Sequence, residues 1–140
     1  MEVPSYQREG KMNILLATDG KAHSEKAVNF AFEHVLSHKA HLYIVYVVNP
    51  KADEDKERLT QGAMGVLETL KNRAVAQGIN VTTMLEAGSP YDTLLAAAER
   101  IKAEAIIVGT SGKTALDRVL IGSVSEFIVR NARCTVIIVK

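Results

Sequence analysis

The sequence predicts a single α/β domain with an open parallel five-stranded sheet and helices on both faces. Five short apolar runs alternate with four segments of helical periodicity. This strict alternation is typical of parallel strands joined by crossover helices. The first, second, fourth and fifth runs are almost wholly apolar, which indicates strands buried on both faces. At 140 residues the chain fits one domain.

The five runs have the length and the β-branched content of strands. Turn-forming residues end three of them: Thr18-Asp19-Gly20 follows the first, Asn49-Pro50 the second, and Ala87-Gly88 the third. The predicted strands are residues 13–17, 42–48, 80–86, 105–108 and 135–139.

Between the runs, apolar residues recur at spacings of three and four, as on the buried face of a helix. Ser24 is placed to cap the first helix, Gly78 to end the second, and Ser89-Pro90 to open the third with a cap and a proline. The expected inward stripes are Val28, Ala31, Phe32 and Val35; Leu59, Ala63, Val66, Leu67, Leu70 and Ala74; Tyr91, Leu94, Leu95 and Ala98; and Val124, Phe127 and Ile128.

Composition excludes several classes of protein. The formal net charge is +1, so the chain lacks the basic field that drives nucleic-acid binding. Cys134 is the only cysteine, which rules out an internal disulfide and favours a reducing compartment. The apolar runs are too short to span a bilayer, and residues 1–11 lack the apolar core of a signal peptide. We therefore expect a cytoplasmic protein without membrane association, with a flexible tail over residues 1–11 and one domain over residues 12–140.

Glycines follow the fourth run, beyond the strand ends where open parallel sheets bind their ligands. Gly109 and Gly112 lack a Cβ, which permits close approach of the backbone to a ligand. Gly122 and Ser123 come at a helix start, whose N–H groups and dipole favour phosphate, and the hydroxyls of Ser123 and Ser125 can donate as well. A Walker A loop is excluded because Ile107 stands where that motif needs its first glycine. The simpler alternative is that these glycines only make turns.

The pattern Gly109-x2-Gly112-x9-Gly122-Ser123 resembles the ATP-binding signature of the universal stress protein family, and the similarity extends over residues 12–140. The resemblance implies a Rossmann-like fold of the adenine nucleotide alpha hydrolase type with strand order 3-2-1-4-5. It also implies an ATP-dependent role in stress response and a homodimer paired through strand 135–139. The nucleotide contacts that it implies come from Ala17, Thr18, Asp19, Val47, Val108, Gly109, Ser111, Gly112, Gly122, Ser123, Val124 and Ser125.

Asp19 has two interpretations. A carboxylate at a strand end can accept hydrogen bonds from ribose hydroxyls, but an aspartate beside Gly20 is also typical of an Asx turn. The residues alone leave both open, and the resemblance favours binding. It also implies that the backbone at Val47 meets the adenine.

Other candidate residues are interpreted as structural. His34 and His38 lie four residues apart on the first helix and could share a metal, but no third ligand is evident, so a solvated pair is favoured. His23 follows Asp19-Gly20 closely enough to contact phosphate, but a plain loop histidine is favoured. Cys134 is expected to pack in the core.

We therefore expect ATP to be bound without catalysis or with only very slow hydrolysis, because no residue is evident to position water. Mg²⁺ or Mn²⁺ is expected to be held mainly through the phosphates, because no carboxylate cluster is available. One alternative is an adenylating or ATP-hydrolysing enzyme of the related nucleotide alpha hydrolase superfamily. That class needs a Ser-Gly-Gly-x-Asp-like loop where this chain has Thr18-Asp19-Gly20-Lys21. A second alternative is a nucleotide-free dimeric interaction module, which the intact glycine spacing disfavours. Where the family usually has proline before its last strand, this chain has Thr135.

Overall fold

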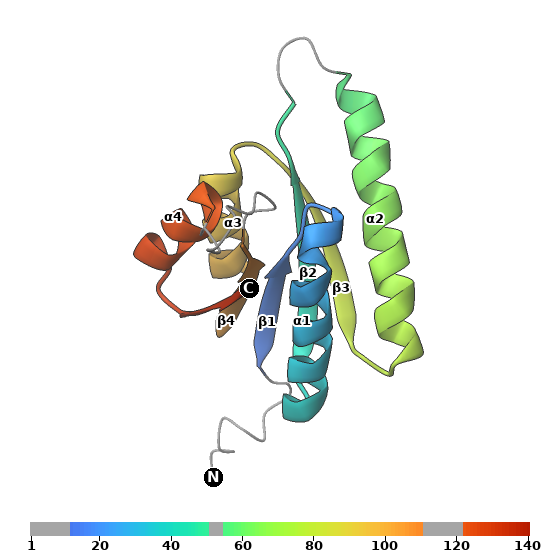
Figure 1. Ribbon diagram of the computed structural model, residues 1–140, viewed down its shortest axis with the longest axis vertical. Coiled ribbons are helices and arrows are strands. Elements are labelled where there is room, and N and C mark those ends of the chain that lie inside the picture. Colours follow the sequence, from blue (N-terminus) through green and yellow to red (C-terminus); the bar gives the residue numbers. More distant parts are fainter. Residues whose placement is uncertain (1–11, 51–54, 111–121) are drawn as a thin grey trace.

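The computed structural model describes residues 12–50, 55–110 and 122–140, and in them strands and helices alternate as predicted (Figure 1). All neighbouring strands are parallel, and their order across the sheet is β3-β2-β1-β4-β5. The fold class and the strand order are therefore confirmed. The elements are β1 (Asn13–Ala17), the 3₁₀ turn η2 (Ala22–Ser24), α1 (Glu25–His38), β2 (His41–Val48), α2 (Lys56–Ala76), β3 (Val81–Ala87), α3 (Pro90–Arg100), β4 (Ala105–Gly109), α4 (Ser123–Asn131) and β5 (Thr135–Val139).

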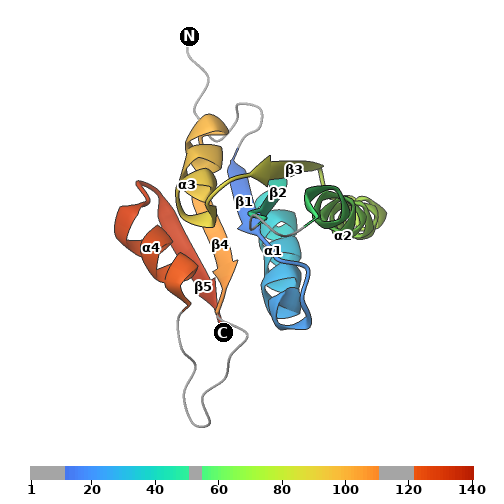
Figure 2. The same ribbon diagram turned by 90° about the horizontal axis from the view of Figure 1, so that it is seen from above.

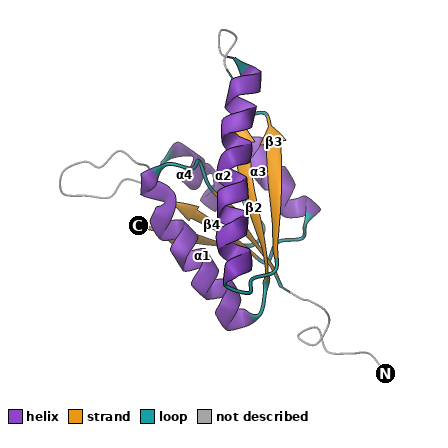
Figure 3. Cartoon of the chain, turned by 90° about the vertical axis from the view of Figure 1, so that its right-hand side faces the viewer, coloured by secondary structure: helices purple, strands orange, loops and turns teal. Residues whose placement is uncertain are grey.

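Helices α1 and α2 cover one face of the sheet, and α3 and α4 cover the other (Figure 2). Alternate strand residues serve the two sides: Ile14 and Leu16 of β1 pack with α1 and α2, whereas Leu15 packs with α3 and α4. The 21-residue helix α2 runs along β2 and β3 (Figure 3). None of the helices in the described segments is both long and apolar enough to cross a membrane.

Strand β5 is less buried than predicted. Its first residue, Thr135, is exposed, and the other four are only half-buried. The reason is its position, because β5 is an outer strand of the sheet and pairs with β4 on one side. The prediction of burial on both faces is therefore wrong for β5 in the single chain.

The helix starts are correctly predicted at one position and wrong at another. Ser89 caps α3 as expected, since its Oγ accepts a hydrogen bond from the N–H of Tyr91 at 3.3 Å and Pro90 follows at the first helical position. Ser24 precedes α1, but its side chain makes no cap hydrogen bond. Its Oγ instead donates to the carbonyl oxygen of Lys21 at 2.7 Å, so this hydroxyl does not cap the N–H groups at the start of α1.

Gly20 is the point where α2 approaches the loop after β1. Its φ is +74°, in the left-handed region, and a Cβ built there would lie 2.7 Å from Cγ2 of Val66 on α2. A side chain at position 20 would therefore meet both backbone strain and a steric clash. Glycine is required here by conformation and by packing together.

Replacing Gly20 by alanine should lower the free energy of unfolding by roughly 1–3 kcal/mol, because of this strain and the contact with Val66. Gly62→Ala is the matched control: Gly62 lies within α2, and a Cβ there meets no atom of the described residues within 4 Å. That change should raise the free energy of unfolding by about 0.5–1 kcal/mol. Urea unfolding followed by circular dichroism measures both variants. A Gly20→Ala protein as stable as the parent would contradict the close approach of α2.

Candidate functional site

A cavity of about 570 Å³ opens at the edge of the sheet where the carboxyl ends of the parallel strands meet. It lies at the ends of β1 and β4. The helices that come next in the sequence, α1 and α4, cover opposite faces of the sheet, and open parallel sheets bind ligands at such a point. The strand ends, the loop after β1 and the first residues of α3 and α4 form its wall. The lining residues are Ala17, Thr18, Asp19, Lys21, His23, Ser24, Val45, Val47, Pro90, Leu94, Val108, Gly109, Thr110, Gly122, Ser123, Val124 and Ser125.

A chain of hydrogen bonds folds the loop that follows β1. The N–H of Thr18 donates to the carbonyl oxygen of Val45 at 3.1 Å, which ties the loop to β2. The Oγ1 of Thr18 accepts from the N–H of Gly20 at 3.1 Å and lies 3.2 Å from Oγ of Ser24. Because the single hydroxyl proton of buried Ser24 goes to Lys21, Thr18 is the donor in the contact between the two hydroxyls. The loop is thus held by its own side chains.

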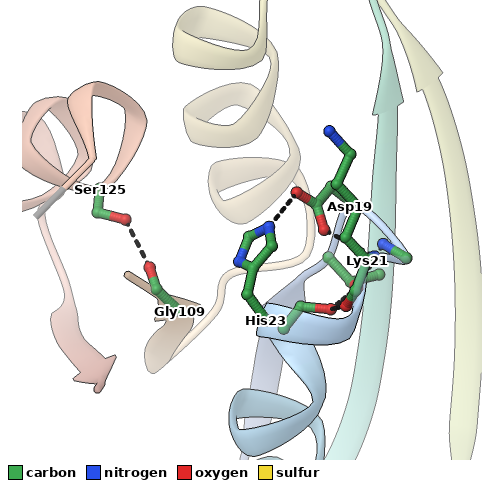
Figure 4. A network of polar contacts seen from close by, with 8 residues as sticks. Asp19, Lys21, His23, Gly109 and Ser125 are labelled. Atoms are coloured by element: carbon green, nitrogen blue, oxygen red, sulfur yellow. Dashed lines mark hydrogen bonds and ion pairs between the residues drawn. The ribbon is translucent and has the colours of Figure 1, made fainter. Parts of the chain in front are cut away.

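Asp19 projects from this loop at the cavity (Figure 4). Its Oδ1 accepts from the N–H of Lys21 at 2.9 Å, so the Asx turn considered from the sequence is present. Its Oδ2 lies 2.9 Å from Nε2 of His23, which brings this histidine into the site. A carboxylate oxygen accepts more than one hydrogen bond, so the turn leaves Asp19 able to accept further donors. Burial, and then the charge of Asp19, raise the pKa of nearby Tyr46 above its ordinary value.

Opposite Asp19, the start of α4 meets the end of β4. Gly122 is the N-cap residue with φ −69°, and the N–H of Glu126 makes the first turn's bond to its carbonyl oxygen at 2.9 Å. The N–H groups that precede Glu126 in the helix have no acceptor within it and carry the positive end of the helix dipole. Buried Ser125 donates from its Oγ to the carbonyl oxygen of Gly109 at 2.8 Å (Figure 4). The expected donation from Ser125 to a phosphate is not what the structure shows, since its proton serves Gly109.

Ser123 contacts the third helix. Its Oγ lies 3.0 Å from the hydroxyl oxygen of Tyr91, the second residue of α3. The ring of Tyr91 in turn packs edge-on against Phe127 of α4, with 5.3 Å between centroids and 77° between planes. The two helices therefore meet through one polar and one aromatic contact directly beside the cavity.

The structure brings the predicted site residues together. Ten of the twelve line the cavity, and the other two, Ser111 and Gly112, lie outside the described residues. That these residues hold a nucleotide remains a prediction.

Sequence reasoning did not assign several of the other lining residues to the site. Val45 shares its strand face with Val47, a period-two signal that could have found it. Pro90 and Leu94 could have been found because α3 starts at the same edge of the sheet at which β3 ends. The sequence favours a plain loop histidine at His23, because the contact of its ring with Asp19 depends on the geometry of the turn. Lys21, Ser24 and Thr110 complete the unassigned set.

The other candidates lie away from the cavity. The rings of His34 and His38 are 4.3 Å apart on α1, and burial and His38 lower the pKa of His34. Within residues 12–50, 55–110 and 122–140, no group of three or more metal-binding side chains forms. Cys134 packs with the cluster under α3 and α4, and burial raises its pKa, as expected for a structural thiol.

Comparisons of sequence and of structure find similarity to the same family of proteins. The model of the universal stress protein family matches residues 11–140. A universal stress protein of Methanocaldococcus jannaschii is 32% identical over 137 residues, covering 91% of this chain and 81% of that protein. A universal stress protein structure from Archaeoglobus fulgidus aligns with a TM-score of 0.80 at 22% identity, covering 93% and 99% of the two chains. A universal stress protein crystallised with cAMP aligns with a TM-score of 0.74 at 26% identity, covering 91% and 95%.

Replacing Ser125 by alanine should lower the free energy of unfolding by roughly 1–2 kcal/mol, because the carbonyl oxygen of Gly109 loses a buried donor. Ser123→Ala is the control, since Ser123 is exposed at the same helix start and should change stability by less than about 0.5 kcal/mol. Urea unfolding of both variants gives the comparison. An equal decrease in the free energy of unfolding of the two variants would show that the hydrogen bond from Ser125 to Gly109 does not stabilise the fold.

Proposed function

The chain belongs to the universal stress protein family, and from this premise we propose that it binds ATP in the cavity at the carboxyl edge of its sheet. We further propose that it acts without catalysis, as a homodimeric regulator of stress response in the cytoplasm. One observation carries the proposal: the cavity joins the loop of Asp19 to the start of α4, two segments more than 100 residues apart in the sequence. A relative of the same fold crystallised with cAMP supports an adenine nucleotide as the ligand.

The proposed ligand lies across the strand ends. Adenine and ribose occupy the side formed by Ala17, Asp19 and Val47, where a carboxylate can accept from ribose hydroxyls and apolar side chains can contact the base. The phosphates extend past Gly109 to the start of α4, whose N–H groups and dipole favour anions. A cavity of about 570 Å³ is within the size range of small-molecule sites.

The glycines at the proposed phosphate side support close approach of a ligand over simple turn formation. Gly122 has φ −69°, and Gly109 is not among the described glycines with positive φ, so neither needs glycine's conformational freedom. Among the described residues, a Cβ at Gly109 would meet the Cβ of Ala27 alone, at 3.7 Å, which is an ordinary contact. The packing of the described residues therefore does not demand glycine at position 109, whereas a ligand lying against the backbone does.

Mg²⁺ or Mn²⁺ would be held mainly by the phosphates in this proposal. Among the described residues that line the cavity, Asp19 is the one carboxylate, and its oxygens already contact Lys21 and His23. A single carboxylate does not form the oxygen cage that an all-protein Mg²⁺ site needs. The same arrangement supports binding without turnover, since the described lining offers no second carboxylate to position a water when Asp19 accepts from the ribose.

Pairing through β5 is the proposed mode of dimerisation. The outer edge of β5 carries backbone groups beyond those that pair with β4, and the half-buried side chains of 136–139 flank it. Such an edge is a template for another strand, and pairing with its copy across a twofold axis covers it in both subunits.

Isothermal titration of the purified protein with MgATP should show binding at one site per chain, and Gly122→Val should weaken it at least tenfold. The valine side chain would stand at the helix start where the phosphates approach, while φ −69° and ψ 162° suit a β-branched residue. Gly62→Ala, on α2 and away from the cavity, serves as the control with unchanged affinity.

Analysis of nucleotide released from the purified protein separates the alternatives. ATP supports the proposal, AMP with pyrophosphate supports an adenylating enzyme, and absence of nucleotide together with no titration heat supports an interaction module. Unchanged affinity in Gly122→Val would contradict the placement of the phosphates.

Sedimentation equilibrium should give twice the chain mass of 15.2 kDa. Hydrogen exchange identifies the surface involved: the β5 amides that do not pair with β4 should be protected at high protein concentration and exchange faster on dilution. A monomer at all concentrations, or a dimer whose β5 amides exchange freely, would contradict pairing through β5.

A further inference from the structure

We propose that Tyr91 is a positioning residue that orients the hydroxyl of Ser123 toward the phosphates and so gives the cavity part of its preference for phosphorylated ligands. This inference rests on the proposed function. Tyr91 is not among the residues that line the cavity, whereas Ser123 is. Its role is therefore exerted through Ser123.

Tyr91 is held in place from three directions. Its own N–H donates to Ser89, which fixes it in the first turn of α3. Its ring packs edge-on against Phe127 of α4, and its hydroxyl oxygen lies 3.0 Å from Oγ of Ser123. Helices α3 and α4 lie side by side on the same face of the sheet, so the contact joins two neighbouring helix starts (Figure 2). A hydroxyl fixed in this way can impose an orientation on its partner.

Counting protons gives the direction of the bond. A serine hydroxyl carries one proton and two acceptor lone pairs, and an ionised phosphate oxygen only accepts. When Ser123 donates to a phosphate, the proton between Ser123 and Tyr91 must come from the tyrosine. The result is a continuous chain from Tyr91 to Ser123 to phosphate, in which each bond polarises the next and the last is charge-assisted.

The other serine at this helix start does not donate to a phosphate in the same way. Ser125 also lines the cavity, but its proton goes to the carbonyl oxygen of Gly109. Ser123 is thus the hydroxyl at this helix start whose donation is set by a side chain from another element. A ligand without phosphates does not complete the chain, so the contribution of Tyr91 depends on the phosphates.

The experiment compares Tyr91→Phe with the parent protein, since phenylalanine keeps the ring against Phe127 and removes only the hydroxyl. Titration calorimetry with MgATP should show affinity reduced about 3–10-fold, the effect of one hydrogen bond. Affinity for adenosine, which has no phosphates, should change less than about twofold. Tyr43→Phe, whose ring lies against His41 on β2, is the matched control and should leave ATP affinity unchanged.

A double-mutant cycle tests whether Tyr91 acts through Ser123. In a Ser123→Ala protein, adding Tyr91→Phe should change ATP affinity by less than about twofold, because the hydroxyl that links Tyr91 to the phosphate is already absent. This arm needs ATP alone and decides the question even where adenosine binds weakly.

The outcomes separate this inference from the function on which it rests. Equal losses for ATP and adenosine, full additivity with Ser123→Ala, or no effect of Tyr91→Phe in a parent that binds ATP would overturn the role of Tyr91 alone. A parent protein that binds no ATP would overturn both proposals.

Discussion

The parallel alignment of β1 between β2 and β4 is the constraint on which the rest of the structure depends. Because the three strands run in the same direction, Ala17, Val47 and Gly109 come to one edge of the sheet. The helices that follow β1 and β4 cover opposite faces of the sheet, and the cavity lies at the ends of these two strands. The alternating side chains of β1 join both cores, so the strand that leads into the loop of Asp19 is anchored on both faces of the sheet.

Each serine or threonine hydroxyl has a single proton to donate, and the use of these protons determines how the cavity wall is built. Ser24 uses its proton on Lys21, which makes Thr18 the donor to Ser24 and fixes the loop of Asp19. Ser125 uses its proton to tie α4 to β4. These contacts make Thr18, Ser24 and Ser125 part of the scaffold, whereas the hydroxyl of Ser123 at the start of α4 is free to donate to a ligand.

Most of the fold could be predicted from the sequence, because apolar periodicity and turn residues act locally. Strands β1 and β5 have the predicted bounds, and the cap at Ser89 is as predicted. The strand order came from the family resemblance, since periodicity carries no information on which strands are neighbours. The failures have a common physical origin: the cap predicted for Ser24 and the burial predicted for β5 both depended on partners that only the folded chain specifies. For the same reason His23 was not assigned to the site.

The absent side chain at Gly20 has a consequence for how relatives of this protein can diverge. Val66 occupies the space that a residue at position 20 would fill, although 45 positions separate the two in the sequence. The volumes at these two places are complementary, so a bulkier residue at one is compatible with this packing only when the other shrinks. Helix α2 thereby sets the shape of the loop that carries Asp19 without contributing an atom to the cavity wall. A smaller residue at position 66 would relieve this clash but not the strain of φ +74°, so homologues that keep this helix packed against the loop should retain glycine at position 20.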